Sequence, residues 1–210
     1  MIDFEIPADV AALRDEVRAF VVDKIVPFER DPRLTRHGPN EELRTELVEL
    51  ARSAGLLTFQ APRRFGGREP SHRDQAVLFE AAGWSTLGPV ALNCAAPDEG
   101  NMFVLSKIAN DEQVEKFLLP VIDGRQRSVF AMTEPGGAGS DPGQLATEAI
   151  FDGTDYVING RKWLITGANG ARTWIIMARV APNSHGADGP TLFLCDGQTP
   201  GIELERVMDT

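Results

Sequence analysis

The chain has 210 residues, of which 42% are apolar and 25% are charged, as in a globular protein that can bury a sizeable core. This composition excludes wholesale disorder. There are 21 Lys and Arg residues against 31 Asp and Glu residues, and the net charge of −10 disfavours nucleic acid and anionic membranes as partners.

The sequence carries little that indicates a metal site, export or membrane insertion. The two cysteines, Cys94 and Cys195, form no C-x-x-C motif, and the three histidines are scattered. No window reaches about 18 consecutive apolar residues, and the N-terminus opens on acidic residues instead of basic ones. We therefore expect a cytoplasmic protein with no metal site and no membrane span.

Apolar residues recur at helical spacing until about residue 125. The spacing and the capping residues predict three helices: from Pro7 to about Val26, from Asn40 as N-cap to Gly55, and from Ser71 to Gly83. Residues 87–109 are expected to form two helical pieces joined by a bend, and Asp111 is expected to cap a short helix after them.

After residue 125 the pattern changes to short runs of β-branched and aromatic residues. Strands are predicted at 128–132, 148–151, 156–158, 162–166, 174–180 and 192–195, with a polar loop at 181–190. Asp152-Gly153 and Asn159-Gly160 are predicted to be tight hairpin turns. Helices followed by strands indicate an α+β fold, with an all-α domain over residues 1–125 and a β domain over residues 126–210.

Residues 130–141 read FAMTEPGGAGSD and place three glycines directly after a predicted strand. Such a loop can bring backbone N–H groups close to a pyrophosphate. No helix follows the glycines, which argues against a doubly wound dinucleotide fold, and the lysine of a P-loop and the glycine of a serine-hydrolase elbow are both missing. By spacing alone, a structural turn and a ligand-binding loop are equally good interpretations.

Residues 160–168 read GRKWLITGA and follow the Asn-Gly turn. Taken alone, Trp163, Leu164 and Ile165 are better explained as the two faces of a strand than as a surface on which a ligand stacks.

The two segments together resemble the acyl-CoA dehydrogenase flavoprotein family. Residues 130–141 resemble its M-T-E-P-G-x-G-S-D segment, and residues 160–166 resemble its G-x-K-x-W-I-T strand. The run NCAAPDEGNM at 93–102 is similar to a branch of the family that in some animals is fused to a kinase-like domain. The resemblance covers essentially the whole chain and implies that the β domain is an antiparallel β-barrel.

The resemblance also implies a cofactor, FAD, and a substrate, an acyl-CoA thioester that is oxidised between Cα and Cβ with hydride transfer to flavin N5. By family position, Met132 and Thr133 contact the flavin from the first strand, and Thr166 donates a hydrogen bond near N5. Leu164 and Ile165 line the flavin ring.

Further site residues follow from the same resemblance. Phe130 and Gly139 complete the predicted cofactor contacts, and Ser140 is expected to contact the FAD pyrophosphate and to lie beside the substrate path. Asn93 and Asn101 are candidates for the wall of the acyl pocket. The alternative for these two residues is a helix bend with a satisfied Asp–Asn hydrogen-bond network.

Two departures from the family pattern affect this interpretation. Leu164 stands where the family usually has a flavin-stacking Trp, and Trp163 should not replace it because successive strand residues face opposite sides. The C-terminal four-helix domain, which carries the catalytic glutamate in most members, is absent from these 210 residues. No catalytic base is therefore nominated, Glu134 is expected to be structural, and the chain is expected to be inactive by itself.

The implied partners are an electron-transfer flavoprotein and either further copies of the chain, as a dimer or tetramer, or a complementing chain. Two alternatives stay open at this point. One is an acyl-CoA oxidase or flavin monooxygenase on the same scaffold, and the other is a non-catalytic binding or assembly module.

Overall fold

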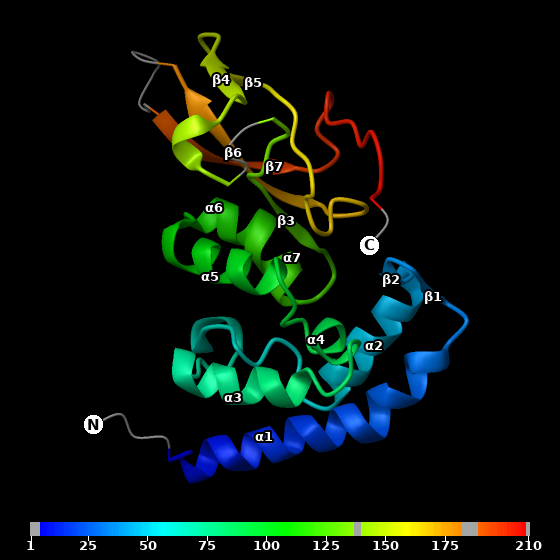
Figure 1. Ribbon diagram of the computed structural model, residues 1–210. Helices are drawn as coiled ribbons and strands as arrows, with labels where there is room; N and C mark the ends of the chain where they lie inside the picture. Colours follow the sequence, from blue (N-terminus) through cyan, green and yellow to red (C-terminus); the bar gives the residue numbers. More distant parts are fainter. Residues whose placement is uncertain (1–4, 137–139, 182–188, 209–210) are drawn as a thin grey trace. The chain divides into compact units, whose positions relative to one another are not determined.

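The computed structural model describes residues 5–136, 140–181 and 189–208. The chain divides into two compact units, a helical unit that ends at Arg125 and a sheet unit of residues 126–208. Figure 1 shows the helices in the first unit and all five strands of the larger sheet in the second. This order confirms the predicted α+β class, with helices first and a sheet second.

The helical unit begins with α1 (Ala8–Phe20), which continues through a π-helical turn and a 3-10 turn to Arg30. A two-residue hairpin, β1 (Leu34–Thr35) and β2 (Gly38–Pro39), leads into the remaining helices. These are α2 (Glu41–Ser53), α3 (His72–Ala82), α4 (Gly88–Ala91), α5 (Asp98–Ile108), α6 (Asp111–Gln113) and α7 (Leu119–Ile122).

Side-chain caps fix where these helices begin. Asn40 Oδ1 accepts a hydrogen bond from Leu43 N at 2.9 Å, and Ser71 Oγ accepts one from Asp74 N at 3.2 Å, as predicted. The predicted cap at Asp111 is wrong by one residue. Asn110 is the N-cap, because its side chain and that of Gln113 each accept the other's backbone N–H in a capping box.

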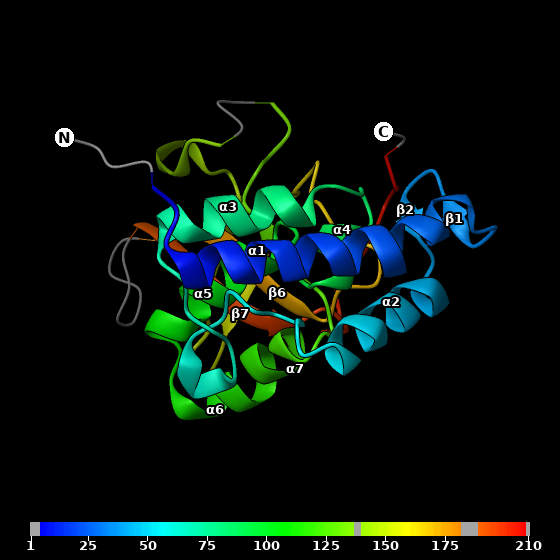
Figure 2. The same cartoon turned by 90° about the horizontal axis from the view of Figure 1, so that it is seen from below.

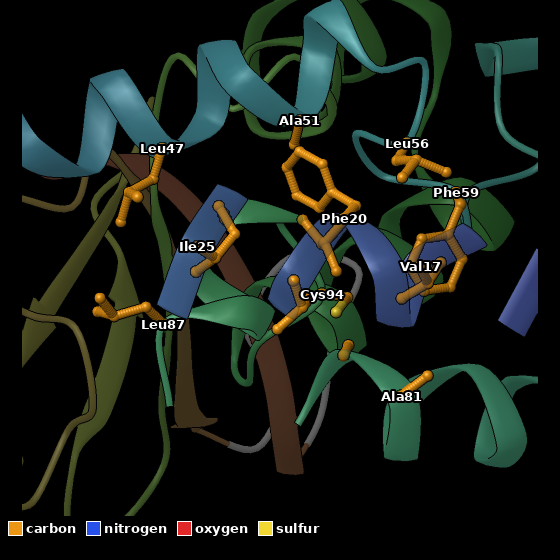
Figure 3. Close-up of a cluster of buried hydrophobic side chains, with 14 of the residues drawn as sticks. Val17, Phe20, Ile25, Leu47, Ala51, Leu56, Phe59, Ala81, Leu87 and Cys94 are labelled. Carbon is orange, nitrogen blue, oxygen red and sulfur yellow. The ribbon is translucent and has the colours of Figure 1, made fainter. Parts of the chain in front are cut away.

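The apolar stripe of α1 forms the core of the helical unit. α1 packs along α3, and the two helices lie side by side in both ribbon views (Figures 1 and 2). Figure 3 shows Val17, Phe20 and Ile25 between α2 on one side and Ala81 of α3 and Cys94, which follows α4, on the other. Burial of these side chains provides the main driving force for folding of this unit.

The sheet unit contains β3 (Ser128–Ala131), β4 (Glu148–Phe151), β5 (Tyr156–Asn159), β6 (Thr173–Val180) and β7 (Gly189–Asp196). The strand order is β3-β6-β4-β5, and β7 also pairs with β6. β6 runs parallel to both β3 and β4, whereas the β4–β5 and β6–β7 pairs are antiparallel. The sheet is therefore mixed and not antiparallel throughout, and its closure into a barrel stays a prediction.

The turn predicted at Asp152-Gly153 is confirmed. Gly153 has a φ of +110°, and Asp152 Oδ1 accepts the backbone N–H groups of Thr154 and Asp155 at 2.9 Å each. The turn joins β4 to β5. The polar loop predicted at 181–190 falls mostly on residues outside the described ranges, and β7 already begins at Gly189.

The strand predicted at 162–166 is wrong, because these residues form bends and turns that pair with no strand. The tight turn predicted at Asn159-Gly160 is also wrong, since the φ of Gly160 is not positive. Glycine is required there for a different reason. A Cβ at residue 160 would lie 2.2 Å from Thr147 Oγ1, so only glycine allows the chain to pass this side chain.

None of the helices in the described ranges combines the length and the apolar character that a membrane span needs. The same residues contain no group of three or more His, Cys, Asp or Glu side chains placed to hold a metal ion.

Candidate functional site

Within the sheet unit, the two motifs singled out in the sequence lie side by side. Trp163 N donates a hydrogen bond to Thr133 O at 3.0 Å, and Lys162 Nζ donates one to Met132 O at 2.9 Å. The segment that leaves β3 and the segment that follows β5 are thus joined over several residues, although about 30 positions separate them in the chain.

A buried ion pair holds these two segments together. Lys162 Nζ lies 2.6 Å from Glu134 Oε1, and the two side chains are only 11% and 9% exposed. Glu134 also accepts the backbone N–H groups of Ala146 at 2.6 Å and Thr147 at 3.0 Å. Burial alone would raise the pKa of Glu134, but the hydrogen bonds from Lys162, Thr147 and Ala146 outweigh it and lower the pKa to about 2. Glu134 is therefore an ionised structural carboxylate.

The backbone turns sharply after this junction. Leu164 has a φ of +53°, a left-handed conformation that is uncommon for a residue other than glycine. Trp163 and Leu164 are 44% and 57% exposed, so the turn presents two large apolar side chains at the surface. Trp163 and Leu164 are therefore not successive residues of a strand, because the backbone is not extended at Leu164.

Backbone conformations of this kind are costly and concentrate at functional sites. An apolar surface on a strained turn, directly beside the end of a strand, is what a planar ring needs for stacking. The turn is therefore a candidate binding surface, which the strand interpretation did not favour.

Of the residues predicted to make polar contacts, Thr133 lies next to this surface, because its carbonyl oxygen accepts the N–H of Trp163, and Thr166 follows Leu164 by two positions. The hydroxyl groups of Thr133, Ser140 and Thr166 take part in no hydrogen bond within the described residues, and Ser140 and Thr166 are exposed. Phe130, Met132 and Ile165 are half-buried, and Gly139 lies outside the described residues.

The exposed apolar side chains of Trp163 and Leu164, next to the hydroxyl-bearing residue Thr133, match an isoalloxazine ring, which is apolar on its faces and polar along one edge. The residues present therefore fit a flavin.

Asn93 belongs to the helical unit and is 6% exposed. Its Nδ2 group donates to Thr58 Oγ1 at 2.9 Å and to Val121 O at 2.7 Å, and its backbone carbonyl accepts from Gln60 Nε2 at 2.8 Å. These bonds use both donors of the amide within the protein. They favour the second interpretation of Asn93, a hydrogen-bonded bend, over a contact with the acyl chain.

Asn101 lies on α5 and is 3% exposed. Its assignment to the wall of the acyl pocket stays a prediction.

Sequence reasoning missed the role of Lys162. The signal was a lysine placed two residues after a glycine that follows a strand, with a glutamate after the first strand of the same domain. It was missed because a lysine beside an aromatic residue on a predicted strand is usually a solvent-exposed residue.

Two family models match the chain. The acyl-CoA dehydrogenase N-terminal domain matches residues 7–125, and the acyl-CoA dehydrogenase middle domain matches residues 129–210. A protein of Mycobacterium tuberculosis assigned as acyl-CoA dehydrogenase FadE2 is 34% identical over 97% of this chain and 52% of its own length.

Solved structures agree with these matches. A structure assigned as an acyl-CoA dehydrogenase from Mycobacterium abscessus has a TM-score of 0.85 and 35% identity, covering 98% of this chain and 54% of its own. A glutaryl-CoA dehydrogenase from Mycobacterium smegmatis in complex with FADH2 has a TM-score of 0.72 and 25% identity, covering 93% of this chain and 47% of its own. The chain thus spans about half the length of the proteins it matches, and across both of its units it belongs to the acyl-CoA dehydrogenase family.

Proposed function

We propose that this chain supplies the flavin-binding part of an FAD-dependent acyl-CoA dehydrogenase. The observation that carries the proposal is the junction of residues 132–134 with residues 162–164, which presents the exposed apolar side chains of Trp163 and Leu164 next to Thr133. Family membership and the FADH2 bound to the M. smegmatis relative support it.

When bound, FAD supplies the two-electron oxidation of the Cα–Cβ bond of the thioester. Thr133 and Thr166 would donate hydrogen bonds to the polar edge of the ring, where negative charge develops during the reaction. Donors placed there stabilise the transition state more than the ground state. Trp163, Leu164 and Ile165 would cover the apolar part of the ring and exclude water from it. Ser140 would bind the diphosphate and border the path of the substrate.

The Glu134–Lys162 pair would position these groups without touching the substrate. Glu134 is unsuited to remove a proton because its pKa is about 2 and its oxygens already accept three hydrogen bonds. We nominate no catalytic base among the 210 residues and propose that the base lies on a further segment or chain.

The wider setting is proposed on the same grounds. Electrons would pass to an electron-transfer flavoprotein, and the chain would work in an oligomer or with a complementing chain, being inactive alone. Both cysteines are free thiols, which supports a reducing compartment such as the cytoplasm.

The test is an anaerobic titration, with saturated acyl-CoA esters of increasing chain length, of the FAD-loaded assembly in which this chain is combined with the segment or chain that supplies the base. The proposal predicts bleaching of the visible flavin band by at least one ester. Thr166→Val should slow bleaching by roughly tenfold or more. In other enzymes, the loss of one hydrogen-bond donor to a charge that develops in the transition state has an effect of at least this size. Thr191→Val, which changes a threonine of β7 outside these motifs, is the matched control.

Each other result of the titration decides against the proposal. Bleaching followed by reoxidation in air within seconds would indicate an oxidase or monooxygenase. Failure of the protein to bind FAD at all would indicate a binding or assembly module.

A further inference from the structure

The peptide group between Met132 and Thr133 is bound to a buried lysine at its carbonyl end. Lys162 Nζ donates a hydrogen bond to Met132 O at 2.9 Å. The N–H of the same planar peptide belongs to Thr133, and it donates to no acceptor within the described residues. Thr133 is half-buried and is one of the residues proposed above to bind the polar edge of the flavin ring. An unused backbone donor therefore lies where the proposed function needs one.

A cation bound to one end of a peptide group strengthens the donor at the other end. The ammonium on Met132 O draws electron density away from the Thr133 N–H through the conjugated C–N bond. Hydrogen bonds with one ionised partner are roughly twice as strong as neutral ones. The side chain of Lys162 is only 11% exposed, so water and salt screen its charge weakly. The Thr133 N–H is therefore a stronger donor than an ordinary backbone N–H.

Glu134 balances the charge of Lys162 without cancelling its effect on this peptide. The carboxylate accepts the backbone N–H groups of Ala146 at 2.6 Å and Thr147 at 3.0 Å in addition to the ammonium. Its negative charge is thus shared among three donors, two of which lie outside the flavin-binding segments. The ammonium is in direct contact with Met132 O. The ion pair is therefore a fixed dipole whose positive end touches the peptide that leads to Thr133.

We propose that Lys162 raises the reduction potential of the bound flavin through the peptide between Met132 and Thr133. The inference rests on the proposed function, because it requires the flavin to lie at this junction. Reduction adds negative charge to the polar edge of the ring, and a strengthened donor there stabilises the reduced cofactor more than the oxidised one. Lys162 acts through a backbone group and is thus a positioning residue with an electrostatic effect.

The test measures the reduction potential of FAD in the loaded assembly described above, by reductive titration against a dye of known potential. Removal of a whole donor to developing charge costs about 100- to 1000-fold in other enzymes, so weakening one donor should cost less. Lys162→Met should lower the ratio of the affinities for reduced and oxidised FAD by roughly tenfold, which is about 30 mV for a two-electron couple. Lys162→Arg keeps the cation and should stay close to the wild-type potential.

Glu134→Gln separates the electrostatic effect from a purely structural one. This variant removes the negative charge and keeps Lys162, so the potential should rise instead of falling. A purely structural role predicts shifts of the same sign in Glu134→Gln and Lys162→Met, because each breaks the same ion pair. Arg179→Met breaks the exposed pair with Glu148 and is the matched control, which should leave the potential unchanged.

Three results would overturn the proposal: an unchanged potential in Lys162→Met, shifts of the same sign in Lys162→Met and Glu134→Gln, or an equal shift in Arg179→Met. If Lys162→Met does not fold, Glu134→Gln decides alone, because a potential that does not rise contradicts the proposal. A wild-type assembly that binds no FAD would refute the proposed function itself. An assembly that binds FAD at a potential insensitive to these charges would refute only the present inference.

Discussion

In each unit of the molecule a non-glycine residue with a positive φ lies in or next to a buried polar cluster, and these two clusters use different chemistry. In the helical unit, Asn93 with a φ of +54° is held by neutral hydrogen bonds to Thr58 and Val121. In the sheet unit, the turn at Leu164 follows a buried ion pair between Glu134 and Lys162. A neutral cluster keeps its stabilising effect at every pH, whereas a charged one requires its carboxylate to be ionised.

The largest expected effect is the loss of one partner of the ion pair. Lys162→Met leaves a buried carboxylate without its cation and should lower the free energy of unfolding by about 3 kcal/mol, measured by urea denaturation. Arg179→Met breaks the exposed pair with Glu148, whose side chains are 47% and 53% exposed, and should cost less than about 1 kcal/mol. If the two variants lower the free energy of unfolding by similar amounts, the buried pair does not stabilise the junction more than an exposed pair would.

The pH dependence separates the two clusters. The folded-state pKa of Glu134 is about 2, below its ordinary value of 4.5, so its contribution to stability is complete above about pH 4.5 and is lost as the pH falls towards 2. The difference in stability between the wild type and Glu134→Gln should therefore shrink over this range. The difference between the wild type and Asn93→Gly should stay constant. Urea denaturation repeated between pH 2.5 and 6 (roughly the range in which carboxylates titrate) checks both.

Removal of the Asn93 side chain has the next largest effect. Asn93→Gly keeps the left-handed backbone accessible but leaves Val121 O and Thr58 Oγ1 without this donor, at a cost of about 2 kcal/mol. Asn93→Ala should cost about 1 kcal/mol more, because alanine also opposes the positive φ. If the two variants are equally stable in thermal unfolding, backbone strain at this position is unimportant.

Replacement of one glycine by alanine in each unit tests how much room the packing leaves for a Cβ atom. Gly160→Ala would place a Cβ 2.2 Å from Thr147 Oγ1 and should destabilise the protein by about 1.5 kcal/mol through overpacking. Gly100 lies in α5 with nothing within 4 Å of an added Cβ, so Gly100→Ala should instead stabilise the helix by about 0.5–1 kcal/mol. Effects of the same sign at both sites would contradict this difference.

The smallest effect is expected at the strained turn. Leu164→Gly relieves the positive φ but increases the freedom of the unfolded chain, so a net gain of about 0.5 kcal/mol is expected. Leu164→Ala keeps the strain and serves as the control, with little change in stability. A Leu164→Gly variant less stable than Leu164→Ala would show that the leucine side chain stabilises the turn by packing.

The sequence predicted the features that depend on local chemistry. Helix starts at Asn40 and Ser71 and the turn at Asp152-Gly153 follow from side-chain caps and positive φ values that neighbouring residues determine. It failed where distant residues decide. Gly160 is required by Thr147, and residues 162–166, predicted as a strand, instead contact residues 132–134 through Lys162 and Trp163. The adjacency of the two flavin motifs came from the family resemblance and not from their spacing.

The central claim is that the junction of residues 132–134 with residues 162–164 holds the flavin ring. Incorporation of 5-fluorotryptophan gives one ¹⁹F resonance for each of the three tryptophans, which single replacements assign. On addition of FAD, the account predicts that the Trp163 resonance shifts more than those of Trp84 and Trp174. A Trp163 resonance that stays unchanged at FAD concentrations that saturate the protein would contradict it.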